Sequence, residues 1–221
     1  QPMNRNAQTV VTDYVESSST TGELRETQVV SHSAVDTAQN VDSVMALLRE
    51  MLETFLLAIV LFLVVNTITS RYEVQSLSME PTLHEGEYLI VSKISYWFRQ
   101  PHRGDIVVLD PPLGQSEIPY IKRVVGLPGE QVEVREGRVW INGTALNEPY
   151  ISGPLAYNGK WTMGEGEYFV LGDNRNNSSD SHAWGVLPQE NILGNAVFRY
   201  WPLEKWGTFT RYGYIELEVN Q

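Results

Sequence analysis

The sequence predicts a mostly β protein, in which an antiparallel β-sheet domain follows one N-terminal transmembrane helix. Residues 55–65 are eleven uninterrupted apolar residues. After residue 70 the chain changes to short runs of alternating apolar and polar residues, separated by Gly, Pro and Asn, with no long amphipathic helical pattern. We therefore expect a disordered tail over residues 1–43, a membrane anchor over 44–70 and a β-rich domain over 71–221.

The expected tail is rich in Ser, Thr, Gln and Asn and shows no sustained hydrophobic period. Such a segment cannot bury enough apolar area to offset the entropy lost on ordering. We therefore expect residues 1–43 to be disordered.

The expected anchor extends over residues 51–68 once four polar residues are included. A bilayer core needs roughly 20 residues, with about 17 as the lower limit, so a transmembrane helix is predicted over a buried core helix. A secretory signal peptide is disfavoured because the run lies deep in the chain, without a basic leader or a small-residue cleavage site. Arg49 and Arg71 flank the run on opposite sides and leave its orientation undecided.

The β-rich domain is expected to contain a strand in each apolar-alternating run, with tight hairpin turns at 135–138 (REGR) and 142–143 (NG). The runs cover residues 87–93, 104–110, 120–126, 130–143, 166–173 and 195–202.

Composition excludes several classes of function. A formal charge of −11 argues against nucleic-acid binding, because a phosphate backbone requires a basic surface. The chain has no cysteine, which excludes disulfides, thiolate metal sites and cysteine nucleophiles. Its four histidines form no His-x-x-x-His pair, and we expect neither a metal nor another cofactor.

The first candidate for chemistry is residues 76–83, SLSMEPTL, which closely follow the apolar run. Pro81 lacks a backbone donor and keeps Glu80 out of the helical region, so the backbone at Ser78 is expected to be extended or turning. A serine there can expose its hydroxyl beside its own N–H, as a nucleophile with a local oxyanion donor requires. Taken alone, the stretch is better explained as a serine-proline turn that connects the membrane helix to the first strand.

A serine nucleophile needs a base, and His182 stands two residues after Asp180 in DSHAWG. Members of a catalytic triad do not normally lie side by side in sequence, and no Gly-x-Ser-x-Gly elbow is present. The second candidate is therefore a lysine.

Lys122 lies in the predicted strand YIKRVVG, where it shares a face with Ile118, Tyr120 and Val124 while Arg123 points to the other face. Desolvation on an apolar face lowers the pKa of a lysine and makes it a general base near neutral pH. The alternative is that its ammonium group reaches the strand edge and solvent.

Residues 172–185, GDNRNNSSDSHAWG, form a dense polar loop after an apolar strand. Its Asp, Asn and Ser side chains can cross-link the loop to the backbone and hold hydroxyls against a buried lysine. A calcium loop of the EF-hand type is excluded, since Arg175 and Trp184 would occupy the third and twelfth ligand positions.

These segments, in this order, resemble the type I signal peptidase family, the membrane-bound serine proteases that remove signal peptides from exported proteins. The resemblance rests on an apolar segment followed by SLSMEPTL, RGDIVVLDPP, YIKRVVGLPGE and GDNRNNSSDSHAWG. The last motif, together with FRYWP, is similar to the cyanobacterial and plastid branch.

The resemblance implies that Ser78 is the nucleophile and Lys122 the neutral general base, a serine-lysine variant of triad chemistry. It implies that the hydroxyl of Ser76 and the Ser78 backbone N–H form the oxyanion hole. Ser178 would orient the lysine, with an Asp173–Arg123 ion pair and the carboxylate of Asp180 as support. The implied apolar wall for small substrate side chains consists of Met79, Leu83, Leu89, Val108, Tyr120 and Ile121.

The chain departs from the family pattern near the supporting residue Asp180 and near Ser76. His182 stands where many bacterial members carry arginine, Asn176 where aspartate is common, and Gln75 where some carry proline.

The implied function is a membrane-bound serine endopeptidase that removes N-terminal signal peptides from exported preproteins, through an acyl-enzyme, at small-x-small sites. Its partners would be these signal peptides and the lipid bilayer, and no nucleic acid. The resemblance places it in the plasma or thylakoid membrane as a single-pass protein, with the tail cytosolic and the catalytic domain on the periplasmic or lumenal side.

Two other classes remain. A membrane-anchored β domain could bind partners without chemistry, but it would not require both Ser78 and Lys122. A soluble self-cleaving repressor with a serine-lysine site would require a helix-turn-helix and a basic surface, and neither is visible.

Overall fold

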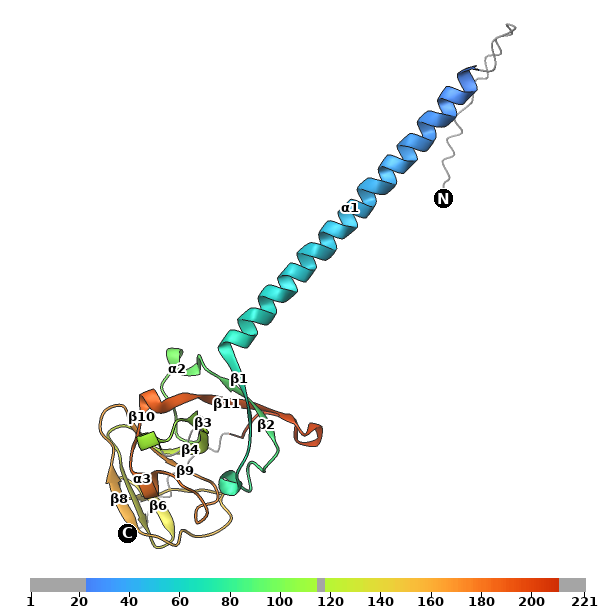
Figure 1. Cartoon of the computed structure of the whole chain (residues 1–221). Helices are drawn as coiled ribbons and strands as arrows, with labels where there is room; N and C mark the ends of the chain where they lie inside the picture. The colour runs from blue at the N-terminus through green and yellow to red at the C-terminus, as the bar shows by residue number, and fades with distance from the viewer. Residues whose placement is uncertain (1–22, 115–117, 211–221) are drawn as a thin grey trace, which may run out of the picture. The chain divides into compact units, whose positions relative to one another are not determined.

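The structure, a computed structural model, describes residues 23–114 and 118–210 and contains a long helix and a β domain (Figure 1). Helix α1 spans Glu23–Ile68, and all the strands follow it in the chain. Contacts divide the chain into two units, residues 1–60 and 61–221. The end of α1 and the whole β domain therefore belong to the second unit.

Within α1, Ser43–Ile68 is the one helical segment of the described chain that is long and apolar enough to cross a membrane. Its apolar side chains are exposed around the helix, and none of this window is buried by protein, which argues against a buried core helix. The hydroxyls of Thr54 and Thr67 donate to the carbonyls of Glu50 and Leu63, each at 2.8 Å. These polar groups are therefore satisfied within the helix, as a lipid environment requires.

The disorder expected over residues 1–43 is not found at residues 23–43, which are helical. No proline or glycine occurs in this stretch, and Gly22 stands directly before it. Because the unfavourable nucleation step is taken once per helix, the apolar segment can extend its helix into a polar sequence of ordinary helix propensity. The rest of the expected tail, residues 1–22, lies outside the described residues.

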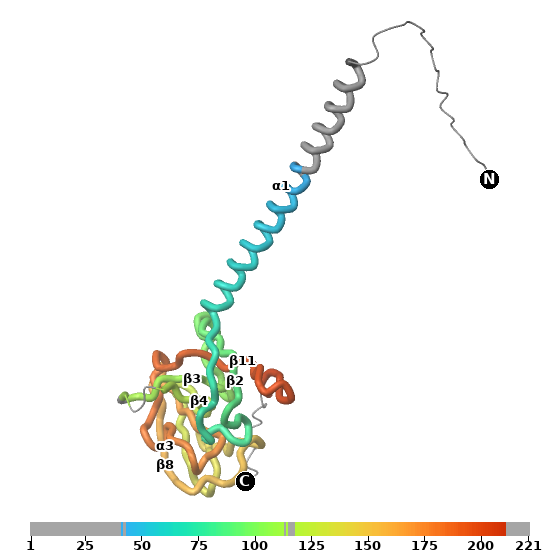
Figure 2. Tube along the Cα trace, turned by 45° about the vertical axis from the view of Figure 1, so that its right-hand side comes forward, coloured from blue at the N-terminus to red at the C-terminus, as the bar shows by residue number. Residues whose placement is uncertain are grey.

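The β domain is built on a seven-stranded sheet with the order β1-β2-β11-β3-β4-β9-β10, in which every neighbouring pair is antiparallel. This confirms the predicted fold class. The strands are β1 Thr69–Glu73, β2 Tyr88–Ser92, β3 Ile106–Leu109, β4 Tyr120–Gly126, β9 Glu167–Leu171, β10 Leu187–Pro188 and β11 Ile192–Trp201. Strands β2, β3, β4 and β11 run close together in both views (Figure 1 and Figure 2).

A second sheet has four strands in the order β7-β6-β5-β8. They are β5 Gln131–Arg135, β6 Arg138–Ile141, β7 Thr144–Ala145 and β8 Gly159–Thr162. Both predicted hairpin turns are confirmed, since Glu136 and Gly137 (φ 53° and 70°) and Asn142 and Gly143 (φ 51° and 88°) adopt the left-handed conformation of two-residue turns. The strands β1, β7, β8 and β10 are too short or too polar for the sequence to have indicated them.

The helices of the β domain are short, as the absence of a long amphipathic pattern predicts. They are α2 Ser95–Phe98 and α3 Ser181–Trp184, with the 3₁₀ turns η1 Leu77–Met79, η2 Pro112–Gly114, η3 Gln189–Asn191 and η4 Leu203–Lys205.

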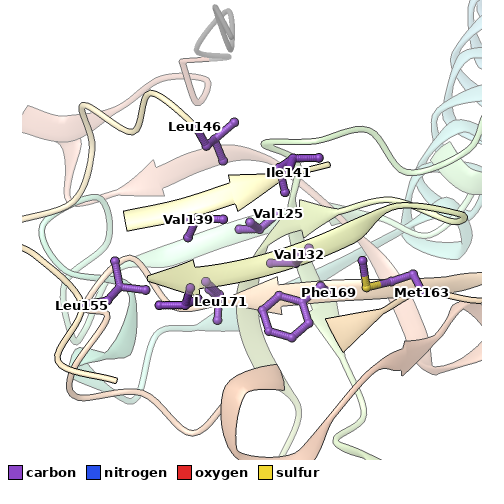
Figure 3. Packing of buried hydrophobic residues seen from close by; sticks show 10 residues of the cluster. Val125, Val132, Val139, Ile141, Leu146, Leu155, Met163, Phe169 and Leu171 are labelled. Carbon is purple, nitrogen blue, oxygen red and sulfur yellow. The ribbon is translucent and has the colours of Figure 1, made fainter. Parts of the chain in front are cut away.

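Two buried clusters hold the site in place. One joins the second sheet to β4 and β9 (Figure 3). Beside it, Val132 and Phe169 pack against Gly126 so closely that a Cβ there would overlap both. The other contains Met79, Leu83, Leu89 and Val108 and lies under the η1 turn. Burying such a side chain contributes roughly 1.5–3 kcal/mol, so η1 is fixed to the sheet by its own Met79.

Candidate active site

Ser78 is presented by the short turn η1. Pro81 follows the turn, and Glu80 before it is extended (φ −65°, ψ 144°), so the helix cannot continue. Directly after Ser78, Met79 is 1% exposed in the core, and its carbonyl accepts the Leu83 N–H at 2.9 Å. The backbone that follows Ser78 is therefore fixed.

Lys122 reaches this hydroxyl from strand β4, which lies between β3 and β9 in the sheet. Its Nζ lies 2.8 Å from Ser78 Oγ and donates to the Ile121 carbonyl at 3.0 Å. The side chain of Lys122 is buried, and the ring centre of Tyr120 lies 5.1 Å from Nζ. The structure thus brings the two predicted catalytic groups within hydrogen-bond distance.

Burial lowers the pKa of Lys122 to about 8, against an opposing effect of the Asp180 and Asp173 carboxylates. No carboxylate within the described chain forms an ion pair with this amine. A lysine with this pKa is neutral in roughly one molecule in ten at pH 7, far more often than a free lysine with a pKa of about 10.4. The amine can therefore accept a proton at physiological pH.

Ser76 stands at the start of η1 with an extended backbone (φ −148°, ψ 158°). Its Oγ lies 3.1 Å from Ser78 Oγ, and its side chain faces a cavity of about 390 Å³. The cavity is lined by residues 73–79 and 118–122, with Asn177 and Ser179. A group bound there would meet both serine hydroxyls.

The predicted apolar wall divides into two layers. Met79, Tyr120 and Ile121 line the cavity. Leu83, Leu89 and Val108 are each 0% exposed, belong to the core behind Met79 and do not reach the cavity surface. The structure therefore places these three behind the cavity surface: Leu89 is a buried position in the alternating pattern of β2, and Val108 lies on β3, whose four residues are all buried. The sequence missed Leu77, Ile118 and Pro119, which do line the cavity.

Arg123 and Asp173 form the predicted ion pair. Nε and Nη2 of Arg123 donate to the two carboxylate oxygens at 2.8 and 2.6 Å, and both side chains are buried. Arg123 also donates to the Gly104 carbonyl at 3.0 Å and stacks 4.2 Å from the ring centre of Tyr150. This pair joins β4 to the start of the polar loop.

Asp180 is fully buried and holds the loop together. Its Oδ2 accepts the Gly172 N–H at 2.8 Å, while Oδ1 accepts the His182 N–H at 3.2 Å and lies 2.7 Å from Nδ1 of its ring. The imidazole of His182 stacks on Tyr157 with ring centres 4.1 Å apart. His182 therefore supplies the side-chain partner of Asp180 within the loop.

Ser178 does not make the hydrogen bond to Lys122 that the resemblance implies. Its Oγ is buried without a hydrogen-bond partner in the described part of the chain. It packs against Gly172, where a Cβ would overlap both Ser178 Oγ and the Ser78 carbonyl. That carbonyl accepts the Asn174 N–H at 3.0 Å. The loop therefore touches the η1 turn that carries Ser78 through its backbone, a contact that the sequence did not indicate.

The sequence also missed how the loop is attached to the second sheet region. Arg175 donates to both oxygens of Glu148 at 2.6 and 2.7 Å and to the Gly172 carbonyl at 3.1 Å. The side chains of both partners are buried. The sequence shows Arg175 only as a single arginine in an Asp- and Asn-rich loop, and no local pattern links it to Glu148, 27 residues earlier. The described residues hold no group of three or more His, Cys, Asp or Glu that could bind a metal.

Comparison with known proteins gives the family and its relatives. Residues 48–201 match the family described as signal peptidase, peptidase S26. A probable signal peptidase I-1 of Synechocystis sp. is 43% identical over 180 residues, which cover 76% of this chain and 90% of that protein. Signal peptidase I of Leptolyngbya laminosa is 47% identical over 172 residues, 72% of this chain and 83% of that protein.

A chloroplast relative completes the comparison. Thylakoidal processing peptidase 1 of Arabidopsis thaliana is 43% identical over 142 residues, 60% of this chain and 42% of that longer protein. The resemblance to the cyanobacterial and plastid branch is therefore confirmed.

Proposed function

The chain belongs to the signal peptidase family, peptidase S26, and we propose that Ser78 and Lys122 are its nucleophile and its general base. It is a serine protease of the signal peptidase I type, which removes signal peptides from preproteins. The observation that carries the assignment is the 2.8 Å separation of Lys122 Nζ and Ser78 Oγ in a buried position beside a cavity, where no described residue forms an ion pair with the amine.

In the first half of the reaction, the neutral amine of Lys122 takes the proton of Ser78 as Oγ attacks the scissile carbonyl carbon. The developing oxyanion accepts hydrogen bonds from the Ser76 hydroxyl and the Ser78 backbone N–H. The C–N bond then breaks, the Lys122 ammonium gives its proton to the departing amine, and the signal peptide remains as an ester on Ser78. The lysine is then neutral again.

In the second half, Lys122 takes a proton from a water molecule, which attacks the ester carbonyl. The same two donors stabilise the second oxyanion. When the C–O bond breaks, Lys122 returns the proton to Ser78 Oγ and the signal peptide leaves as a carboxylic acid. Each half of the reaction therefore leaves the serine-lysine pair in its starting protonation state.

The cavity supports a preference for small side chains near the cut. Met79, Tyr120 and Ile121 form its apolar surface next to the serine, and its volume is about 390 Å³. Ligand pockets that bury a drug-sized molecule span about 300–1,000 Å³, so this cavity lies at the small end. Small-x-small cleavage sites fit such a surface.

Ser43–Ile68 is proposed to anchor the protein in the plasma or thylakoid membrane, with the β domain on the periplasmic or lumenal side. The cut site of a preprotein lies just beyond its own hydrophobic segment. A protease domain that begins at Thr69, one residue after the helix ends, is held at the matching position.

The proposal is tested by cleavage of a preprotein in detergent with Ser78→Ala and Lys122→Ala, each checked for folding by circular dichroism. Both variants are expected to lose cleavage, because one lacks the nucleophile and the other the base. Ser152→Ala, an exposed serine distant in sequence, is the matched control and should cleave normally. Mass spectrometry of the wild-type products should place small residues one and three positions before the cut. Cleavage by either dyad variant would overturn the assignment.

The proposed side of the membrane can be tested separately because the chain has no cysteine. Lys160 lies exposed on β8, and Lys160→Cys introduces a single thiol in the β domain. A membrane-impermeant maleimide added to intact cells with a permeabilised outer membrane should label it. Labelling only after the inner membrane is opened would contradict the proposed orientation.

A further inference from the structure

The cavity beside Ser78 is lined by two charged residues of the described chain, and only one of them is accessible to solvent. Lys122 is buried against the Ser78 hydroxyl. Glu73, the last residue of β1, is exposed. No described residue forms an ion pair or a side-chain hydrogen bond with the Glu73 carboxylate. This carboxylate can therefore meet a charged group of a substrate that enters the cavity.

The backbone holds Glu73 in a fixed direction. Glu73 pairs with Tyr88 across the β1–β2 ladder, and the N–H of Val74 donates to the Glu87 carbonyl at 2.8 Å. The residues on either side of it, Tyr72 and Val74, pack into the core cluster that contains Met79. Because side chains alternate along an extended strand, the Glu73 side chain points away from that core.

Glu73 lies between the candidate membrane span and the nucleophile. Strand β1 leads from the end of α1 into the β domain (Figure 1), with Glu73 five residues after Ile68 and five before Ser78. The hydrophobic segment of a signal peptide precedes its cut site. A preprotein that runs from the proposed membrane position to Ser78 therefore passes Glu73 with residues that precede the cut.

The position of these residues follows from strand geometry. Five extended residues span at most about 17 Å, and the compact η1 turn shortens the distance from Glu73 to Ser78. An extended substrate covers this distance with about four to six residues. The apolar surface of Met79, Tyr120 and Ile121 lies next to the serine and acts on residues nearer the cut.

We propose that Glu73 is a specificity-determining residue, which favours preproteins with a basic side chain four to six residues before the cut and disfavours those with an acidic one. The inference rests on the proposed function and names the class of signal peptide that the site prefers. An exposed ion pair is weak, so we expect a preference of about two- to fivefold for each charge step, from glutamate to glutamine and from glutamine to lysine.

The proposed role of Glu73 is separate from that of the base. Burial lowers the pKa of Lys122 to about 8, and the carboxylates that oppose this effect are those of Asp180 and Asp173. Glu73 is not one of them. Substitution of Glu73 should therefore change the choice of substrate and leave the pH dependence of kcat/KM in place.

The test measures kcat/KM of the full chain in a neutral detergent on a set of soluble peptides. All carry alanine one and three positions before the cut, and lysine, glutamine or glutamate at position four, five or six before it. The wild type should prefer lysine to glutamine and glutamine to glutamate at the position nearest Glu73. Glu73→Gln should abolish this preference, and Glu73→Lys should reverse it, which a simple loss of folding cannot do.

Glu165→Gln is the matched control. It removes the same charge from an exposed glutamate that does not line the cavity, so it should keep the wild-type preference. Its loss of preference would show that the overall negative charge of the protein attracts the peptides, and would overturn the inference. A preference as large in about 1 M salt as in about 0.1 M would do the same, because the Debye length falls from about 10 to about 3 Å.

The remaining outcomes separate this inference from the proposed function. If the wild type cuts all the peptides at equal rates and Ser78→Ala cuts none, only the charge preference is overturned. If the preference survives in Glu73→Gln, or if that variant shifts the pH limb near 8, the role given to Glu73 is wrong. If the wild type cuts none of the peptides, the proposed function fails and this inference fails with it.

Discussion

Lys122 and Arg123 are neighbours on β4 and point to opposite faces of the strand, and both are nearly inaccessible to solvent, at 3% and 1% exposure. Arg123 is held by both oxygens of Asp173. Lys122 has no ion pair in the described chain and meets the hydroxyl of Ser78 instead. The two buried basic side chains on opposite faces of β4 therefore differ in their partners: Arg123 forms an ion pair, and Lys122 contacts a hydroxyl.

The difference shows that the role of a buried basic side chain depends more on whether it has an ion-pair partner than on how deeply it is buried. A guanidinium is always protonated, so it must be paired when it is buried, and Arg123 becomes a structural tie between β4 and the polar loop. An amine can lose its proton instead, and burial lowers the pKa of Lys122 to about 8. We therefore expect substitutions of Lys122 to lower the rate of cleavage and substitutions of Arg123 to lower the free energy of unfolding.

The largest expected effect is that of Lys122→Met, which keeps the length and apolar stem of the side chain. Cleavage should fall at least about 10²–10⁴-fold, the usual contribution of a general base. The free energy of unfolding, measured by urea denaturation, should be unchanged or raised, because no ion pair is broken and a polar group leaves the interior. Strong destabilisation would mean that Lys122 is structural, and the contrast with Arg123 would fail.

The opposite result is expected for Arg123→Met. It leaves the Asp173 carboxylate buried without its partner, which should lower the free energy of unfolding by about 3–5 kcal/mol. The double variant Arg123→Met, Asp173→Leu should recover much of that loss, since removal of both charges is often tolerated. A single variant as stable as the wild type would show that the ion pair does not tie the two segments.

Ser76→Ala sharpens the comparison within the active site. It removes one expected oxyanion donor from an exposed position, so kcat should fall by about 10²-fold while KM and stability stay close to wild type. Steady-state kinetics on a soluble peptide measure the two constants separately. A rise in KM with kcat unchanged would instead assign Ser76 to substrate binding.

The smallest effect is expected at His182, whose ring is partly exposed. His182→Ala should cost about 1 kcal/mol of stability through the lost hydrogen bond to Asp180. His182→Asn can place an amide nitrogen near the position of Nδ1 and should retain most of that energy. Thermal unfolding compares the two variants. Equal losses in both would show that stacking on Tyr157, and not the bond to Asp180, gives His182 its role.

Local pattern made Ser78 and Lys122 candidates, the serine in a proline-limited turn and the lysine on an apolar strand face, but their roles as nucleophile and base were predicted from the resemblance to the signal peptidase family. It also indicated the main strands and both hairpin turns, which depend on short-range pattern and turn chemistry. What it missed depends on tertiary contacts. The partner of Arg175 is Glu148, 27 residues earlier, and no local pattern links the two.

Two corrections have the same origin. Leu83 is an apolar residue near the serine, but only the packing of η1 against the sheet shows that it lies in the core behind Met79 and not at the cavity surface. Residues 23–43 are polar enough to suggest disorder, yet they continue a helix that the apolar segment nucleates. Ser178 remains a predicted partner of Lys122, although its hydroxyl has no hydrogen-bond partner among the described residues.

The most direct test of the central claim is the pH dependence of kcat/KM on a soluble peptide. Lys122 must be neutral to accept the proton of Ser78, so activity should rise with pH along a limb with an apparent pKa of about 8. The same limb should persist in His182→Asn. A limb near the value of free lysine, about 10.4, would contradict the account. So would a limb near about 6.5 that disappears in His182→Asn, because the base would then be a histidine.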